Sequence, residues 1–219
     1  MIVIETHSGL CNRLRMVFSF YYLSLEKKER LYVIWKPDSY CPGFFLDYFE
    51  PIENVEFVKE NKKKYKITNR GDWYEKYSPY KMFVYDKLKP KKEIQNQIDR
   101  ISKKLNNDYI AVHIRRTDNK APKHKYTSDE DFITFIEKYK DKNLYIATDN
   151  CKTQKKFYNN YKNNIKILNK IKPSGKLRQT TLKASIIELY ICIYANEFKG
   201  SGWSSFSSTI CQFRNGVIL

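Results

Sequence analysis

The chain has 219 residues, of which 42% are hydrophobic and 16% are aromatic. That length and composition exclude a disordered or fibrous protein and allow one large domain or two small ones with a substantial core. The formal net charge is +17, but the lysines are spread along the whole sequence. Scattered lysine is typical of a solvated surface, so nucleic acid is not an expected partner.

No targeting segment is recognisable in the sequence. The first residues lack the charged start and long apolar stretch of a secretory signal, and no run reaches the roughly 18 apolar residues of a membrane span. The five cysteines are odd in number and far apart, without CxxC pairs or histidines at ligand spacing. We therefore expect a cytoplasmic protein with free thiols, without a membrane span, a disulfide or a metal site.

The first part of the chain alternates between predicted strands and helices. Short apolar runs predict the strands, and an apolar stripe at helical spacing predicts the longest helix. In chain order the expected elements are a strand at Ile2–Ile4, a loop at Thr6–Asn12, a helix at Arg13–Leu25, a strand at Leu31–Trp35, a short helix at Pro42–Tyr48 and a strand at Val55–Val58. This order is half of a doubly wound parallel sheet. Residues 59–86 show no sustained period and are expected to connect to a second unit.

A second unit of the same kind follows. Ile94, Ile98, Ile101 and Leu105 recur at helical spacing after Pro90 and predict a helix with one buried face. The remaining expected elements are a strand ending at His113, a helix from Ser128 or Asp129 to Tyr139, a strand at Leu144–Ala147, a helix at Lys152–Tyr161, a strand at Ile165–Leu168, a helix at about Thr180–Ala195 and a strand at Glu197–Gly200. The predicted fold is therefore α/β, with two Rossmann-like domains, residues 1–86 and 87–219, facing each other across a cleft.

The most informative segment is His113-Ile114-Arg115-Arg116-Thr117-Asp118, which follows directly on the apolar run Tyr109–Val112. Such a run is typical of a buried parallel strand, and open α/β sheets bind ligands at the carboxyl ends of their strands. Two arginines there offer fixed forks of donors that match the oxygens of a pyrophosphate. Alternation along the strand predicts that His113 and Arg115 face the ligand, while Arg116 and Asp118 pair on the other side. The alternative is an ion-pair cluster that only closes the strand.

Two further segments are expected at the same cleft. Asp149, after the strand at Leu144–Ala147, can accept hydrogen bonds from a base or a ribose, although Asp-Asn after a strand is also ordinary turn chemistry. Residues 200–208 combine two glycines with several serines, and small residues let backbone amides approach an anion. A flexible loop is the alternative there. Trp203 and Phe206 argue against it, because we expect them to anchor the segment.

Taken in this order, the three segments resemble the donor-binding half of the fucosyltransferases that include the α1,6-, α1,2- and protein O-fucosyltransferases. The amino-terminal His7-Ser8-Gly9-Leu10-Cys11-Asn12-Arg13-Leu14 is similar to the glycine-rich first loop of those enzymes. The resemblance implies a GT-B fold, GDP-fucose as the donor, no cofactor, and metal-independent transfer with inversion at the anomeric carbon. It also implies that Arg115 contacts the pyrophosphate, Asp149 the guanosine, and Ser207 and Ser208 the phosphates.

The sequence departs from the family at one point. Members of the α1,6 type carry a glutamate five residues after the motif aspartate, where this chain has Lys123. The catalytic base is therefore open among His7, His124 and Asp129, each of which also suits a surface or capping position. The chain is short for the family, which suggests a minimal catalytic core.

The resulting prediction is a glycosyltransferase whose partners are a nucleotide sugar and a glycan or protein acceptor. Two other functions stay open: a GT-B enzyme with a different nucleotide sugar, and a non-catalytic module that binds anionic ligands. The predicted site comprises Arg115 and His7 as catalytic residues, His113, Arg115, Arg116, Asp118, Asp149, Ser207 and Ser208 as donor-binding residues, and Gly9, Asn12 and Arg13 in the first loop.

Overall fold

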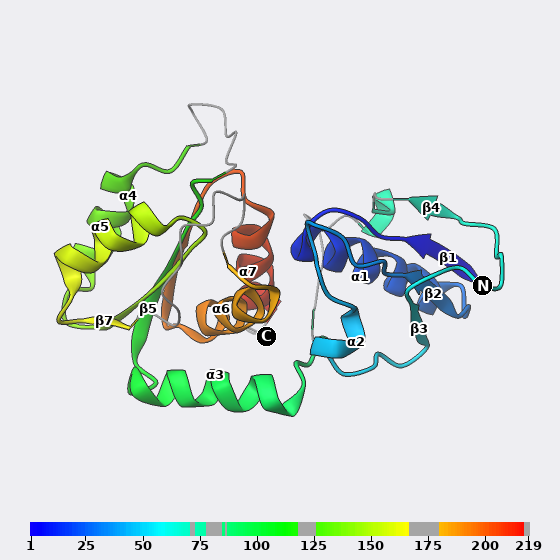
Figure 1. The fold of residues 1–219 in the computed structure, drawn as a ribbon, viewed down its shortest axis with the longest axis horizontal. Coiled ribbons are helices and arrows are strands. Elements are labelled where there is room, and N and C mark those ends of the chain that lie inside the picture. Colours follow the sequence, from blue (N-terminus) through cyan, green and yellow to red (C-terminus); the bar gives the residue numbers. More distant parts are fainter. Residues whose placement is uncertain (71–72, 78–84, 86, 118–125, 167–179, 217–219) are drawn as a thin grey trace. The chain divides into compact units, whose positions relative to one another are not determined.

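The structure is a computed structural model that describes residues 1–70, 73–77, 85, 87–117, 126–166 and 180–216 (Figure 1). The chain divides into two compact units, which we describe separately. The first comprises Met1–Lys92 with Asn215–Leu219, and the second comprises Glu93–Arg214.

The first unit is built on a four-stranded parallel sheet with strand order β3-β2-β1-β4. The strands are β1 (Ile2–Glu5), β2 (Leu31–Ile34), β3 (Val55–Val58) and β4 (Asn69–Arg70), and the helices are α1 (Leu10–Glu26), α2 (Phe45–Tyr48) and the 3-10 turn η1 (Glu75–Tyr77). Helix α1 begins three residues earlier than the sequence predicts. The reason is that Gly9 is its N-cap and accepts the amide of Arg13, so Asn12 and Arg13 lie in the first helical turn and not in a loop.

The second unit repeats this plan, with strand order β7-β6-β5-β8 and every pairing parallel. Its strands are β5 (Tyr109–Ile114), β6 (Asn143–Thr148), β7 (Ile165–Lys166) and β8 (Glu197–Gly200), and the helices that follow Lys91 are α3 (Lys92–Lys104), α4 (Asp129–Lys138), α5 (Cys151–Tyr161), α6 (Leu182–Tyr194) and α7 (Ser205–Gly216). The α/β class with two Rossmann-like parallel sheets is confirmed. Ser128 caps α4 as predicted, since its hydroxyl accepts the amide of Asp131.

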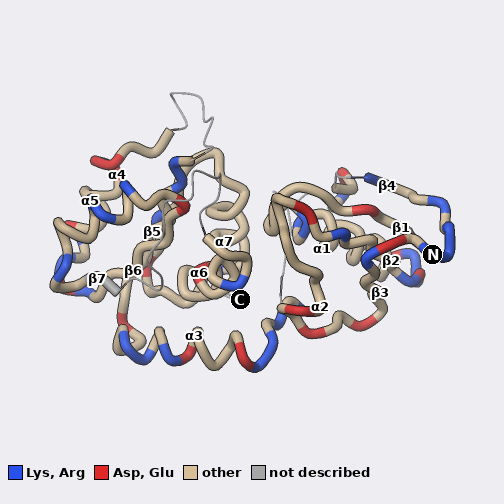
Figure 2. The backbone as a smooth tube through the Cα atoms, viewed as in Figure 1, with Lys and Arg blue, Asp and Glu red and all other residues tan. Residues whose placement is uncertain are grey.

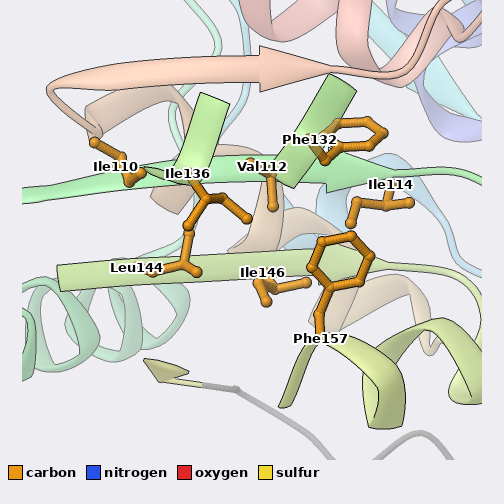
Figure 3. Close-up of a cluster of buried hydrophobic side chains, with 8 residues drawn as sticks. All are labelled: Ile110, Val112, Ile114, Phe132, Ile136, Leu144, Ile146 and Phe157. Atoms are coloured by element: carbon orange, nitrogen blue, oxygen red, sulfur yellow. The ribbon is translucent and has the colours of Figure 1, made fainter. Parts of the chain in front are cut away.

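Alternation along β5 sends its side chains to two different layers of the second unit. Ile110, Val112 and Ile114 face α4 and α5 in a buried cluster (Figure 3) that also contains Phe132, Ile136, Leu144, Ile146 and Phe157. Each of these large side chains contributes about 1.5–3 kcal/mol when fully buried. The residues between them face the other way, and the Tyr109 hydroxyl donates to the carbonyl of Ile191 on α6 at 2.8 Å. His113 therefore belongs to the α6 and α7 side of the sheet.

Charged residues and cysteines occur in both units. Lysines and arginines are distributed over both units and alternate with acidic residues along α3 (Figure 2). None of the five cysteines, all of which lie in the described part of the chain, forms a disulfide. In the described part of the chain, no helix combines the length and apolar character needed to cross a membrane.

Candidate functional site

Three segments singled out in the sequence end at one edge of the second sheet. In the parallel register His113 lies between Ala147 of β6 and Gly200 of β8. The residues that follow these strands therefore emerge side by side at their carboxyl ends, where ligands bind in open α/β sheets. The sequence predicted that the three segments converge, and the sheet register confirms it.

Hydrogen bonds tie the segments after β5 and β8 together. The amide of Arg115 donates to the Ser201 hydroxyl at 2.9 Å, and that hydroxyl donates to the carbonyl of His113 at 3.1 Å. The Ser201 amide donates to the same carbonyl at 3.0 Å. Farther along, the Gly202 amide donates to the Thr127 hydroxyl at 2.8 Å. The backbone around Arg115 is thus fixed by a neighbouring strand.

His113 is buried and uncharged. Burial, with a further contribution from the positive charge of Arg115, lowers the pKa of His113 to about 3. Its Nδ1 lies 2.7 Å from the Ser207 hydroxyl, and its ring packs against that of Phe206 at a tilt of 34°, with ring centres 4.6 Å apart. These contacts join β5 to α7. An imidazole with this pKa is a poor proton acceptor at neutral pH, so His113 does not suit the role of a base.

Ser207 reaches His113 because residue 200 is a glycine. A Cβ atom on Gly200 would lie 2.5 Å from the Cβ of Ser207, closer than any ordinary contact. Ser207 is also buried in the first turn of α7 and not in a flexible loop. Ser204, the residue before α7, accepts the Ser207 amide on its hydroxyl, as an N-cap residue does. The Ser208 hydroxyl donates to the Ser204 carbonyl.

The Arg116 side chain points to the opposite layer from His113, as alternation predicts. Its guanidinium binds Asp129 at 2.7 Å and lies over the rings of Tyr126 and Phe132. Lys156 binds the other carboxylate oxygen of Asp129 at 2.7 Å. Burial opposes ionisation of Asp129, but the hydrogen bonds from Arg116 and Lys156 outweigh it and lower its pKa.

The structure bears on one of the proposed bases after β5, Asp129. Asp129 suits that role poorly, because both of its oxygens are held by cations. His124 lies outside the described residues, as do Lys123 and Asp118, the expected partner of Arg116. In the described part of the chain, Arg116 pairs with Asp129, whose position at the start of α4 brings it back beside the motif.

Asp149, which follows β6, stabilises the segment that follows β5. Its carboxylate accepts the Arg116 amide at 2.8 Å and the Thr117 hydroxyl at 2.5 Å. The Thr148 hydroxyl adds a bond to the Ile114 carbonyl at 2.6 Å. These contacts fix the direction in which the chain leaves β5, so Asp149 acts on the loop that carries Arg115.

Glu188 is a buried acid that the sequence reasoning missed. It is 8% exposed on α6, and burial together with the charge of Asp149 raises its pKa to about 8. Its charge also raises the pKa values of the buried Tyr145 and Cys192, although burial is the larger cause for both. The signal was present, because Glu188 is the single charged residue within the apolar run Ala184–Ile193.

The predicted first-loop residues lie in the other unit. Arg13 is fully buried, and its guanidinium donates to the carbonyls of Ser8 and Lys36 and to the Asp38 carboxylate. Arg13 therefore holds together the segments that follow β1 and β2. Gly9 is buried, whereas Asn12 and His7 are exposed.

Two further observations concern possible ligands. Within the first unit, a cavity of about 650 Å³ is lined by residues of the 61–70 segment, none of which is a predicted site residue. Among the described residues, no group of three or more histidine, cysteine, aspartate or glutamate side chains is arranged to hold a metal ion.

Comparison with known proteins gives a fold. No family model and no curated protein matches the sequence. The fucosyltransferase NodZ from Bradyrhizobium matches 98% of this chain and 92% of its own, with a TM-score of 0.66 and 14% identity. POFUT1 in complex with GDP matches 98% of this chain and 95% of its own, with a TM-score of 0.61 and 11% identity. A mutant of Arabidopsis thaliana FUT1 in complex with GDP matches 97% of this chain and 68% of its own, with a TM-score of 0.56 and 12% identity. This chain therefore has a fucosyltransferase-like fold.

Proposed function

We propose that this protein is a glycosyltransferase that moves fucose from GDP-fucose to a hydroxyl group of a glycan or protein acceptor. One observation carries the proposal: Arg115 and the first turn of α7 lie at the carboxyl edge of the second sheet, and the buried acid Glu188 on α6 lies close enough to Asp149 for their charges to interact. They offer what a nucleoside diphosphate needs, namely donors for phosphate and an acceptor for a base. The fucosyltransferase-like fold supports this reading, and a NodZ structure soaked with GDP-fucose exists in that fold.

The pyrophosphate would bind Arg115 and the amino terminus of α7. The backbone of Arg115 is fixed by Ser201, so its guanidinium is presented by a rigid strand end. Helix α7 is 12 residues long, and its dipole favours an anion at its first turn. In this proposal Ser207 and Ser208 contribute through the helix start that they help to build, because their hydroxyls are bonded to His113 and Ser204.

Glu188 would recognise the base. Guanine presents neighbouring N–H donors on one edge, and an ionised carboxylate presents only acceptors. A buried carboxyl group that is costly to ionise alone becomes favourable to ionise when it accepts such bonds. Asp149 would then position the loop, with its carboxylate committed to Arg116 and Thr117.

The reaction would be a direct displacement with inversion. The acceptor hydroxyl attacks the anomeric carbon while the bond to the diphosphate breaks, and negative charge grows on the leaving group. Fixed donors stabilise that charge in place of a metal ion, and the loss of one such donor typically costs about 3 kcal/mol in the barrier. We assign the second unit to the donor and the first to the acceptor, with His7 as the candidate base on the acceptor side.

A thermal-shift panel tests the proposal. GDP and GDP-fucose should raise the melting temperature without added divalent cation and with EDTA present, whereas ADP and UDP should not. Arg115→Lys keeps the charge but loses the fork, so it should weaken GDP binding about tenfold with the fold intact. Arg100→Lys, on the exposed face of α3, is the matched control. A parent protein that GDP does not stabilise would refute the proposal.

A further inference from the structure

The cavity of the first unit has no role in the donor site. Its volume is about 650 Å³, within the range of about 300–1,000 Å³ that is typical of small-molecule sites. The lining combines two cations, two amides, a hydroxyl and an aromatic ring, and no acid is among the described residues that form it. The lining residues are Asn61, Lys64, Tyr65, Ile67, Thr68, Asn69 and Arg70.

The segment that forms the cavity is held on the first sheet at several points. Tyr65 and Ile67 pack against a buried apolar cluster of that sheet. The Thr68 amide donates to the Val3 carbonyl at 2.7 Å, and the Thr68 hydroxyl accepts the Val3 amide at 3.2 Å. The Asn61 side chain closes a turn, because it accepts the Tyr65 amide at 3.0 Å and donates to the Tyr65 carbonyl at 2.8 Å. The cavity is therefore built into the fold.

Lys64 lies at this cavity in a costly conformation. Its backbone is left-handed, with φ of 52°, a region that glycine and asparagine adopt more readily than lysine does. The neighbouring Lys63 binds Glu56 at 3.4 Å. Lys64 is exposed and forms no ion pair with an acid in the part of the chain that the structure describes. The turn itself does not need a lysine there, so its charge calls for another reason.

Arg70 supplies the second charge, at the carboxyl end of β4. Its side chain is 69% exposed, and its Nε binds Glu5 at 2.9 Å. A guanidinium has several N–H donors, so the pair with Glu5 leaves donors for a further anion. Glu5 lies opposite Arg70 in the parallel register and two residues before His7. The cavity therefore adjoins the strand that leads to the candidate base of the acceptor side.

We propose that this cavity binds a negatively charged sugar of the acceptor glycan, one that carries a carboxylate, sulfate or phosphate group. The inference rests on the proposed function. Lys64 and Arg70 supply charge for the anionic group, and Thr68 and Asn69 offer polar groups for sugar hydroxyls, which both donate and accept hydrogen bonds. The Tyr65 ring adds apolar surface for the ring of the sugar. A neutral sugar would leave the two cations without a counter-charge, so the cavity favours an acidic one.

Calorimetry with matched oligosaccharides tests the requirement for charge. The first probe is a hyaluronan tetrasaccharide, in which glucuronic acid carries the carboxylate, and its neutral counterpart has those carboxylates reduced to alcohols. The 6-sulfate and 6-phosphate of N-acetylglucosamine, compared with N-acetylglucosamine itself, test the other two anionic groups. We expect at least one acidic probe to bind at least about tenfold more tightly than its neutral counterpart, and more tightly than tetraglutamate, an acidic peptide without a sugar.

Three variants separate the cavity from its surroundings. Lys64→Asn removes the charge and suits the left-handed backbone, so it should melt no lower than the parent. It should bind the acidic probe about tenfold more weakly, which is the scale of one lost hydrogen bond to a charged group. Arg70→Gln should have a similar effect on binding. Lys62→Gln is the matched control, because Lys62 belongs to the same run of lysines but does not line the cavity, and it should bind as the parent does.

The outcomes distinguish this inference from the proposed function. Equal losses in Lys64→Asn and Lys62→Gln would show only diffuse attraction between charges and would overturn the cavity site. Equal affinity for acidic and neutral sugars, or tighter binding of tetraglutamate, would also overturn it. If the parent binds GDP but no acidic sugar, the cavity site is wrong and the proposed function stands. If it binds an acidic sugar but no GDP, the proposed function fails and the acceptor role of the cavity fails with it.

Discussion

Glu188→Gln keeps the shape of a buried side chain and removes its titration. The pKa of Glu188 is raised to about 8, against 4.5 for the free side chain, first by burial and then by the charge of Asp149. Between these values the folded protein holds a proton that the unfolded chain has released. The parent therefore loses stability as the pH rises from 4.5 to about 8. The whole interval corresponds to about 5 kcal/mol in the free energy of unfolding.

Urea denaturation at about pH 5, 7 and 9 measures this effect. Glu188→Gln and the parent should be similarly stable near pH 5, and the variant should gain an increasing advantage toward pH 9. Glu197→Gln, at an exposed position on β8, controls for the loss of a negative charge. A stability difference that stays constant across these pH values would show that Glu188 does not hold its proton in the folded protein, and the reasoning would be refuted.

The same variant tests the recognition of the base. Below a pH of about 8, most of the protein carries protonated Glu188, in which one carboxylate acceptor has become an O–H donor that does not match the N–H donors of guanine. GDP affinity of the parent should therefore rise with pH more steeply than that of Glu188→Gln, whose response reports the titration of the phosphates alone. Parallel pH profiles for the two proteins would remove Glu188 from the base site.

Three other substitutions probe the strand ends. Gly200→Ala should lower the free energy of unfolding by about 1–3 kcal/mol and weaken GDP binding, because the new methyl group displaces Ser207; an unchanged melting temperature would contradict this. Arg116→Lys should cost about 1–3 kcal/mol of stability, because it removes the guanidinium that donates both to Asp129 and to the Arg115 carbonyl, and it should weaken GDP binding less than Arg115→Lys does; the reverse order of GDP affinities would contradict it. Ser207→Ala should melt lower than Ser208→Ala, since only Ser207 bonds the buried His113; equal melting would count against that bond.

Periodicity accounts for what the sequence predicted well. The inward positions of α3 follow from helical spacing, and Ile94, Ile98 and Ile101 are all buried. The cap at Ser128 follows from local chemistry. The order of strands and helices also fixes which segments meet, because parallel strands share a carboxyl edge. Each of these inferences uses only neighbours in the chain or the general geometry of parallel sheets.

Contacts that depend on helix packing were out of reach. Arg116 was expected to pair with Asp118, which lies outside the described residues, and the contact that the structure describes is with Asp129 on α4. Trp203 and Phe206 were expected to anchor their segment; Trp203 is 60% exposed, whereas Phe206 packs against the ring of His113. Glu188 was overlooked because an apolar helix suggests only a core.

Three features on and beside the second sheet carry a cost in stability. Glu188 keeps a carboxyl group buried near Asp149, His113 stays uncharged in a position that opposes protonation, and Trp203 holds a left-handed backbone. Where the sheet faces α4 and α5, it is covered by ordinary apolar packing (Figure 3). Costly groups persist when ligand binding offsets their cost. Stabilising substitutions should therefore concentrate at these residues, and the same substitutions should weaken donor binding.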